Sequence, residues 1–302
     1  MADNKEVAML FDSSHCTGCR GCQVACKQWN VLPASLELNA NEKNFNGTYQ
    51  GPLDLNGDTR LIMTFDEKPS GDKFHPVNWS IGRRSCYHCT DAGCVKACSS
   101  GALSKDERVV KLDTDKCNGC TFCQAACPFD VPRFRPMDGR IDKCTLCIDR
   151  LDNGGIPACV KTCQPEALRF GPREEMLKKA HERVEFLKKK GFTKAEVYGE
   201  NECGGLHVIH VCAYGHEAYG LPTDPKPKAV LNGIDIIKPV TAVGTAAVIG
   251  ALAVSFLANL GYRRKEVTLE EAKAHWTPEQ RALAEREARE ALKKVQSGKD
   301  AH

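Results

Sequence analysis

The chain has 302 residues with 42% hydrophobic and 27% charged side chains, a composition that excludes a disordered or fibrous protein. Its formal net charge of +3, from 42 basic and 39 acidic residues, provides no broad basic surface of the kind that binds nucleic acid, so we expect no nucleic-acid partner. The 18 cysteines need a specific chemical cause, because a chain of this length can bury a core without covalent cross-links.

Sixteen of the cysteines form four groups of four in the first 163 residues. The first group lies in HCTGCRGCQVACK and has the spacing C-x2-C-x2-C-x3-C, which the third group repeats. The second group reads C-x2-C-x4-C-x3-C, and the fourth reads C-x2-C-x11-C-x3-C. Because all four groups end in the same x3 step, we interpret them as an internal repeat of one functional unit. The groups are Cys16, Cys19, Cys22 and Cys26; Cys86, Cys89, Cys94 and Cys98; Cys117, Cys120, Cys123 and Cys127; and Cys144, Cys147, Cys159 and Cys163.

The C-x2-C-x2-C loop is typical of a [4Fe–4S] cluster, because it wraps three thiolates around one cluster while the x3 step carries a fourth cysteine toward a neighbouring cluster. Structural zinc sites use two C-x2-C knuckles and give no reason for a third cysteine so close to the second. Disulfides are also disfavoured, since three thiols in such a short loop are poorly placed to pair with one another. All sixteen positions are cysteine. We therefore expect four [4Fe–4S] clusters and no three-iron variant.

The remaining two cysteines, Cys203 and Cys212, have no partner group, and we interpret them as ordinary small side chains. His207 and His210 alternate with valines as in a strand, so we expect core or sheet-surface histidines rather than ligands. Basic residues accompany every cysteine group and either offset the charge of a thiolate-ligated cluster or are simply solvated. These residues are Arg20, Lys27, Lys96, Lys116, Lys143 and Lys161.

Residues 172–190 predict an amphipathic surface helix that packs on the cluster-binding part of the chain. Leu177, Ala180, Val184 and Leu187 share one face of this helix, with a proline at its first turn, acids early, lysines late and Gly191 after its end. A loop, a short strand and the proline-rich linker LPTDPKPK at 221–228 follow.

Residues 239–262 contain 24 consecutive positions without a charged side chain, enough for a helix of about 36 Å. A bilayer core is about 30 Å thick, so we expect one transmembrane helix. A buried helix in a soluble domain is the less favoured alternative, because such helices are seldom apolar all round for so long. Small residues recur every fourth position, which lets a membrane partner pack closely. They are Ala242, Ala246 and Gly250, and again Ala247, Ala251 and Ser255.

Arg263, Arg264 and Lys265 follow the apolar segment directly, so the positive-inside rule places the carboxyl-terminal tail in the cytoplasm and the cluster domain on the periplasmic side of the inner membrane. Within the tail, Thr277 and Gln280 predict the cap of a charged helix that ends near residue 295. The first residues, MADNKEVAMLFDSSHC, contain no signal-peptide core and no twin arginine. We therefore expect export as a folded passenger of a partner subunit.

The motifs resemble those of the iron–sulfur (beta) subunit of membrane-bound respiratory formate dehydrogenase, a four-cluster ferredoxin-type relay subunit. The segments CRGCQVACKQWN and KCTLCIDRLDNGGIPACVKTCQPEALRFG, the helix beginning REEML, the GLPTDPK linker and the single membrane helix have counterparts there in the same order. The resemblance covers about residues 8–262. Relay subunits of many molybdenum enzymes and some hydrogenases share the cluster motifs. Among these relay subunits, the membrane helix combined with the lack of a leader favours the formate dehydrogenase subunit.

The resemblance implies an α+β fold of two ferredoxin-like halves with pseudo-twofold symmetry and exchanged ligands. One cluster would then be held by three cysteines of the first group and the last cysteine of the fourth group. The neighbouring cluster would be held by the other three cysteines of the fourth group and the last cysteine of the first group. The spacing itself supports an exchange between the second and third groups but could not show the exchange between the first and fourth. The implied ligand sets are Cys16, Cys19, Cys22 and Cys163; Cys144, Cys147, Cys159 and Cys26; Cys86, Cys89, Cys94 and Cys127; and Cys117, Cys120, Cys123 and Cys98.

We expect a double ferredoxin-like domain at 1–172, a packing helix, strand and linker at 173–228, a transmembrane helix at 229–264 and a charged tail helix at 265–302. The resemblance implies a non-catalytic subunit that carries electrons from a molybdenum- or tungsten-bis-pterin catalytic alpha subunit, through four clusters, to a membrane cytochrome b gamma subunit that reduces quinone. The alternatives are the relay subunit of a membrane hydrogenase or another molybdoenzyme and, in another class, a membrane-anchored zinc-binding assembly protein.

Overall fold

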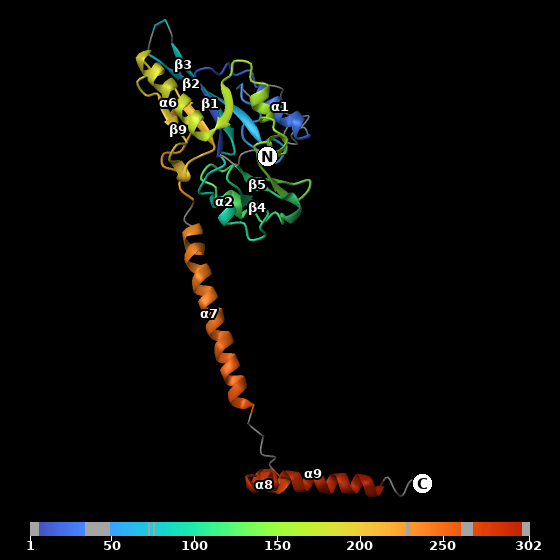
Figure 1. Ribbon diagram of the computed structural model, residues 1–302. Helices are drawn as coiled ribbons and strands as arrows, with labels where there is room; N and C mark the ends of the chain where they lie inside the picture. Colours follow the sequence, from blue (N-terminus) through green and yellow to red (C-terminus); the bar gives the residue numbers. More distant parts are fainter. Residues whose placement is uncertain are drawn as a thin grey trace. The chain divides into compact units, whose positions relative to one another are not determined.

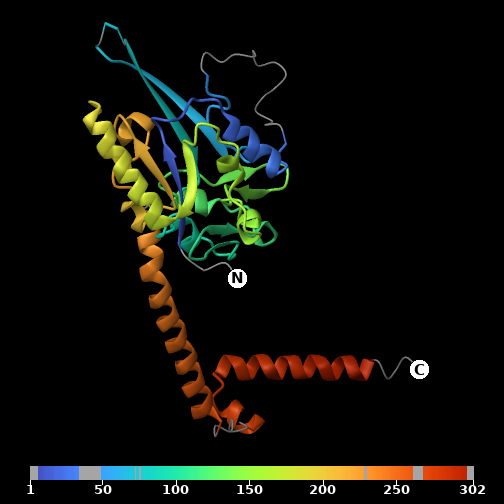
Figure 2. The same ribbon diagram turned by 45° about the horizontal axis from the view of Figure 1, so that its top comes forward.

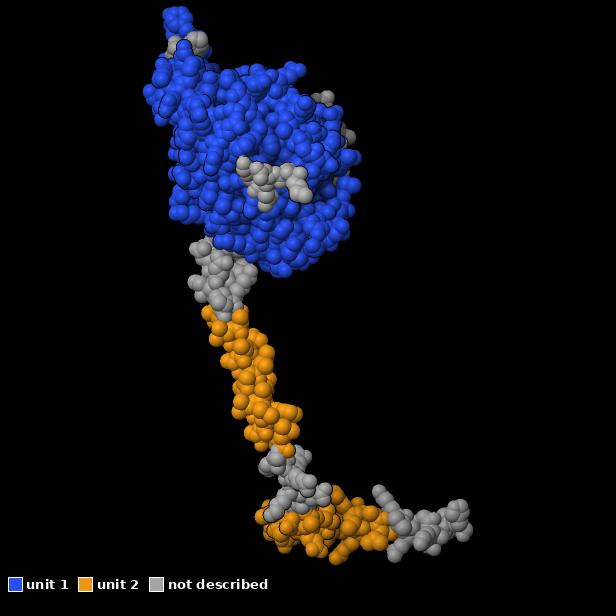
Figure 3. Space-filling model, in the orientation of Figure 1, with its two compact units in different colours: residues 1–238 blue, residues 239–302 orange. Residues whose placement is uncertain are grey.

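The computed structural model describes residues 6–33, 49–71, 73–74, 76–227, 230–260 and 268–297. The chain divides into two compact units, residues 1–238 and 239–302, which Figure 3 colours separately. The first unit contains all the cysteines and is a mixed α/β structure with one four-stranded sheet and three two-stranded sheets in its described part.

The four-stranded sheet is built around β1 (Val7–Asp12), the strand that precedes the first cysteine group. β1 pairs with β8 (Leu168–Pro172) in the antiparallel direction and with β10 (Val208–Cys212) in the parallel direction, and β9 (Glu196–Tyr198) completes the order β8-β1-β10-β9. Both central strands are almost entirely buried, as expected for a sheet that is covered on both faces. The strand predicted around His207 and His210 is therefore confirmed, and both histidines are buried.

Alternate residues of the central strands face two different cores. Ala8 and Leu10 of β1 pack with α6 (Arg173–Lys189), whereas Met9 and Phe11 pack in the core that contains the buried cysteines. The same alternation in β10 follows from the two-residue period of a strand. The sheet therefore separates α6 from the cysteine-rich side, and Figures 1 and 2 show α6 lying along the sheet in both views.

The predicted helix at 172–190 is confirmed as α6. It begins after Pro172, has Glu174 and Glu175 in its first turn, and ends with lysines in its last turn. Its fully buried positions are Met176, Ala180, Val184 and Leu187, while the predicted face residue Leu177 is only partly buried. Ala180 follows Met176 by four residues, so both side chains lie on the same face of α6. The long Met176 side chain therefore fills the core in place of Leu177.

A long hairpin joins the first two cysteine groups. Its strands are β2 (Leu61–Pro69) and β3 (Val77–Ser85), which pair antiparallel along their whole length. The base of the hairpin is buried in the cysteine-rich core, whereas Val77 and Trp79 near its far end are about half exposed. The far end projects beyond the rest of the first unit in both ribbon views (Figures 1 and 2).

The cysteine-rich side consists of short helices and short hairpins. The two hairpins are β4–β5 and β6–β7. The helices and strands are α1 (Gly21–Trp29), α2 (Gly93–Lys96), β4 (Leu103–Lys105), β5 (Val110–Leu112), α3 (Phe122–Ala126), β6 (Arg133–Arg135), β7 (Arg140–Asp142), α4 (Ile148–Asp152) and α5 (Ala158–Lys161), with short 3-10 turns at Thr114–Lys116, Glu202–Gly204 and His216–Tyr219.

The second unit is helical in its described part. Within α7 (Val230–Asn259), the segment Val240–Asn259 has a mean hydropathy of 2.1 and is not buried against other described residues. By length and composition, it is one candidate membrane span. The tail contains α8 (Leu269–Ala274) and α9 (Pro278–Ser297), and the predicted cap of α9 is confirmed by reciprocal hydrogen bonds between Thr277 and Gln280. The basic residues at 263–265 lie outside the described residues.

Candidate metal centres

The two C-x2-C-x2-C loops have the same backbone. In the first loop Gly18 has φ 67° and Arg20 has φ 59°, and in the third-group loop Gly119 has φ 71° and Thr121 has φ 61°. These left-handed residues turn each loop back on itself, so that its third cysteine enters the first turn of α1 or α3. Gly119 also lies so close to the carbonyl oxygen of Gly139 that a Cβ atom has no room there.

A second repeat concerns the other two cysteine groups. The sequences CVKACSSGAL and CVKTCQPEAL begin at Cys94 and Cys159, and both give a short helix that leads into a strand. The helix α1 packs on α5, and α2 packs on α3, so each C-x2-C-x2-C loop is paired with one copy of the second repeat. In both copies a leucine amide at the start of the strand donates to the group's last sulfur at 3.3 Å, Leu103 to Cys98 and Leu168 to Cys163.

The folded chain regroups the thiols of the first and fourth groups into two sites. At site 1, the thiol of Cys16 lies within electrostatic reach of Cys19 and Cys163, and that of Cys22 within reach of Cys16 and Cys163. At site 2, Cys26 meets the remaining cysteines of the fourth group in one enclosed cavity. The cavity is lined by Cys26, Cys144, Cys147 and Cys159, together with two arginines, Asn30, Thr145 and apolar side chains.

The second and third groups are regrouped in the same manner. At site 3, Cys89 and Cys94 each lie within electrostatic reach of Cys86 and Cys127. At site 4, the neighbours of Cys123 are the other three thiols. Site 3 therefore gathers Cys86, Cys89, Cys94 and Cys127, and site 4 gathers Cys98, Cys117, Cys120 and Cys123.

The four sites follow one another in a line. Sites 1 and 2 are neighbours through Cys22 and Cys159, and sites 2 and 3 through Cys144 and Cys86. Sites 3 and 4 are neighbours through Cys94 and Cys123. The two exposed cysteines in the chain are Cys19 at site 1 and Cys120 at site 4, so both ends of the line reach the surface. All four cysteines of site 2 are buried, whereas site 3 has two buried and two partly exposed cysteines.

The thiol chemistry fits a polynuclear metal cluster. All eighteen cysteines are free, so no disulfide competes for them. Within the described residues, no group of three or more His, Cys, Asp or Glu side chains is arranged to hold a single metal ion. Burial raises the pKa of Cys22, Cys123 and Cys147 to about 12 and that of Cys127 to about 11. Such thiols become ligands when metal replaces the proton, and four thiolates at one site are the ligand set of a [4Fe–4S] cluster.

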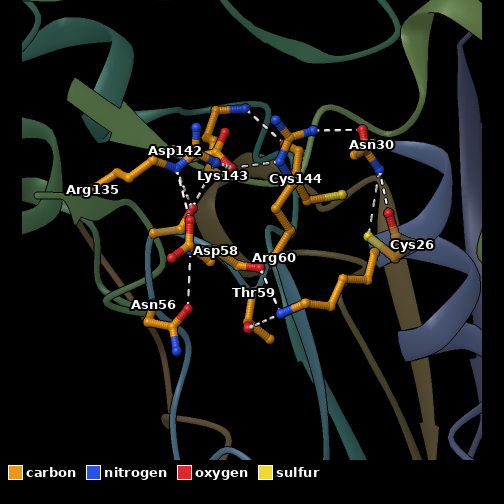
Figure 4. Close-up of polar contacts among 12 residues, drawn as sticks. Cys26, Asn30, Asn56, Asp58, Thr59, Arg60, Arg135, Asp142, Lys143 and Cys144 are labelled. Atoms are coloured by element: carbon orange, nitrogen blue, oxygen red, sulfur yellow. Dashed lines mark hydrogen bonds and ion pairs between the residues drawn. The ribbon is translucent and has the colours of Figure 1, made fainter. Parts of the chain in front are cut away.

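A polar chain connects Cys26 to a buried carboxylate (Figure 4). Asn30 donates to the carbonyl oxygen of Cys26 at 2.7 Å and to its sulfur at 3.7 Å. Arg60 donates to Asn30 at 2.6 Å and to Asp142 at 2.7 Å, and Asp142 also accepts from Arg135 at 2.8 Å. This chain fixes the orientation of Asn30 and leaves the Arg60 charge paired with a carboxylate.

Of the six basic residues that sequence analysis associated with the cysteine groups, only Lys143 is fully buried. Its ammonium group donates to the carbonyl oxygens of Val110 at 2.6 Å and Cys144 at 3.0 Å. Lys96 and Lys116 form ion pairs with aspartates at the surface. The interpretation of these residues as solvated surface charge therefore holds for Lys96 and Lys116 but not for Lys143.

Two neighbours of the thiols were not predicted from the sequence. The buried Arg83 on β3 lines the site 2 cavity. The thiol of Cys203 interacts with that of Cys89, and also donates to the carbonyl oxygen of Pro225 at 3.1 Å. The burial of Arg83 could have been predicted from its position three residues before Cys86, in a strand whose alternate residues point inward.

Comparison with known proteins agrees with this geometry. Family models described as 4Fe-4S dicluster domains match residues 15–103 and 77–173. The chain is therefore an iron–sulfur protein that contains two dicluster domains.

Its relatives define the family more closely. The chain is 40% identical to the formate dehydrogenase iron-sulfur subunit of Haemophilus influenzae, over 84% of this chain and 80% of that protein. It is also 40% identical to the formate dehydrogenase-O iron-sulfur subunit of Escherichia coli K12, over 82% of this chain and 81% of that protein. The chain belongs to the family of formate dehydrogenase iron–sulfur subunits, which confirms the resemblance. The hydrogenase-2 operon protein HybA of Escherichia coli O157:H7 is 32% identical over 72% of this chain and 73% of that protein.

Proposed function

We propose that this chain conducts electrons from a molybdenum- or tungsten-bis-pterin catalytic subunit, through four [4Fe–4S] clusters, to a membrane cytochrome b that reduces quinone. Oxidation of formate to carbon dioxide releases two electrons and one proton, and the electrons pass through the clusters one at a time. The chain itself makes and breaks no substrate bond in this proposal. Its residues set the distance between the clusters, their burial and their potentials.

The observation that carries the proposal is the linear order of four sites with four thiols each, ending at an exposed thiol on either side. A chain of neighbouring redox centres with two accessible ends suits transfer between two partner subunits. Each site would hold one cluster through its own four thiolates, so the ligand sets are those defined for sites 1 to 4. The repeated loop geometry supports two ferredoxin-like halves related by an approximate twofold axis.

We further propose the four-part organisation predicted from the sequence, with residues 1–172 binding the clusters, 173–228 supporting and linking them, 229–264 crossing the inner membrane once and 265–302 forming the tail. The apolar segment Val240–Asn259 supports the membrane anchor, and the basic residues at 263–265 favour a cytoplasmic tail and a periplasmic cluster domain. A chain truncated after Pro227 and expressed without its partners tests the anchor by membrane fractionation.

Anaerobic purification of the full complex tests the cluster assignment. We expect about sixteen irons and about sixteen acid-labile sulfides per chain. A colourless chain with four zinc ions would instead identify the zinc-binding alternative and overturn the relay. Formate-dependent reduction of the clusters by a co-purifying subunit separates a formate dehydrogenase from a hydrogenase relay, for which hydrogen would be the effective reductant.

A further inference from the structure

Among the described residues, Arg83 is a buried cation with no carboxylate at ion-pair distance. Its side chain is 3% exposed, and its hydrogen bond from Nη1 to the Ser85 hydroxyl measures 2.6 Å. Its Nε atom is buried and has no hydrogen-bond partner in the described part of the chain. Within the same residues no carboxylate lies at ion-pair distance from it, in contrast to Arg60, whose Nε is 2.7 Å from Asp142. A buried guanidinium without a carboxylate partner is costly, so its counter-charge must come from another source.

The thiols of sites 1 and 2 surround the Arg83 charge. Arg83 lines the enclosed site 2 cavity with all four of that site's cysteines. The groups that act on its charge most strongly are Cys159, Cys144, Cys22 and Cys26, of which three belong to site 2 and one to site 1. Thiolates that hold a cluster would therefore supply the missing negative charge at the place where Arg83 is buried.

The neighbouring His210 ring does not change the net charge around Arg83. Burial, aided by Arg83 itself, lowers the pKa of His210 to about 3, so that ring is neutral at physiological pH. Arg83 is therefore a fixed cation between sites 1 and 2 over the whole physiological pH range.

We propose that Arg83 is a positioning residue for electron transfer, whose permanent charge raises the reduction potential of the cluster at site 2 and, more weakly, that of site 1. This inference rests on the proposed function, because it requires clusters at these sites. A cluster with four thiolates is negatively charged, and its reduction adds one more negative charge. Burial in the interior penalises the reduced form, and a nearby cation offsets that penalty.

Arg83 would bring the reduction potentials of neighbouring clusters closer together. Site 2 is interior, with all four of its cysteines buried, whereas site 1 has the exposed Cys19. Without a compensating cation, the interior cluster would have the lower potential and would slow electron transfer as a barrier between its neighbours. With Arg83 in place, the interior cluster is reducible at a potential closer to that of the surface cluster.

Three variants of the purified complex test the proposal. Arg83→Met removes the charge with little loss of volume, Arg83→Lys keeps a charge, and Arg84→Met is the matched control. Arg84 is the next residue on β3, but it is one-third exposed and its Nη1 is 2.7 Å from Asp54. The readout is a potentiometric titration of the reduced clusters followed by electron paramagnetic resonance, with iron and sulfide measured on the same samples.

We expect Arg83→Met to lower the potential of one cluster by the equivalent of about tenfold in its reduction equilibrium, ~59 mV for one electron. Arg83→Lys and Arg84→Met should stay close to the wild type. Unchanged potentials in a fully iron-loaded Arg83→Met complex would overturn the inference, as would an equal shift in Arg83→Lys. If Arg83→Met does not assemble, Arg83→Gln replaces it with the same expected shift. Absence of iron from the wild-type chain would instead refute the proposed function.

Discussion

Replacing Cys163 with alanine distinguishes the grouping seen in the folded chain from the grouping in the sequence. In the sequence Cys163 closes the fourth group, but its thiol lies with Cys16 and Cys22 at site 1. We therefore expect Cys163→Ala to remove the cluster at site 1 and to leave the cluster at site 2 in place. The sulfur also accepts the amide hydrogen of Leu168 at 3.3 Å, so its loss leaves a buried donor without a partner.

The magnitude follows from four thiols at each of four sites. Complete loss of one cluster lowers the iron content from about sixteen to about twelve per chain, a fall of one quarter. The unpaired Leu168 amide adds a destabilisation of about 1 to 3 kcal/mol to the strand β8. A fall to about eight irons would mean that the cluster at site 2 had been lost as well. That result is expected only if sites 1 and 2 cannot assemble separately.

The assay compares the reduced electron paramagnetic resonance spectra of three variants, Cys163→Ala, Cys16→Ala and Cys159→Ala. Cys16 belongs to site 1, whereas Cys159 lies only four residues from Cys163 but lines the site 2 cavity. The spectrum of Cys163→Ala should match that of Cys16→Ala, with the same signal missing. If it matched Cys159→Ala instead, the exchange of ligands between the first and fourth groups would be refuted.

Three further predictions concern stability and location. In anaerobic urea unfolding, Met176→Ala should lower the free energy of unfolding by about 2 to 5 kcal/mol, because Met176 is buried between α6 and the sheet. Leu177→Ala should lower it less, because Leu177 is only partly buried, and equal losses would contradict the observed helix face. Although burial opposes the shift, hydrogen bonds from Lys111 and nearby backbone amides lower the pKa of Asp106, so Asp106→Asn should reduce stability near pH 7 by about 1 kcal/mol. That difference should vanish as the pH falls through the lowered pKa of folded wild-type Asp106, and persistence at acidic pH would refute it. The chain truncated after Pro227 should leave the membrane fraction when expressed without partners, and retention there would contradict the anchor.

Local patterns in the sequence predicted the elements that depend on neighbouring residues. The periodicity of residues 172–190 identified α6, the alternation around His210 identified β10, and Thr277 identified the start of α9. Leu177 shows the limit of this approach, because a helical wheel cannot decide which of two adjacent apolar residues meets the sheet. That choice depends on the sheet's position, which is determined by strands far apart in the sequence.

Long-range arrangements could not be derived from the sequence. The parallel pairing of β1 with β10 joins the two ends of the first unit, and no local pattern specifies it. The spacing of the cysteines predicted clusters but could not pair the first group with the fourth. Arg83 is buried because β3 carries it under the thiols, whereas its sequence neighbour Arg84 points toward Asp54 at the surface. Adjacent strand residues face opposite sides, and only the fold decides which side is the interior.

The proposed exchange of ligands would make each pair of sites one mechanical unit. Helix α1 gives Cys22 to site 1 and Cys26 to site 2, one helical turn apart on the same face, with a rise of about 6 Å between them. On the other side of the α1–α5 contact, Cys159 on α5 returns to site 2, and Cys163, two residues after the end of α5, returns to site 1. Two clusters would therefore cross-link α1 to the same short segment. The spacing between neighbouring clusters is then set by a helical turn, the stiffest local geometry available to the chain. Metal binding at one site would also preorganise the next, because both sites share the same helix.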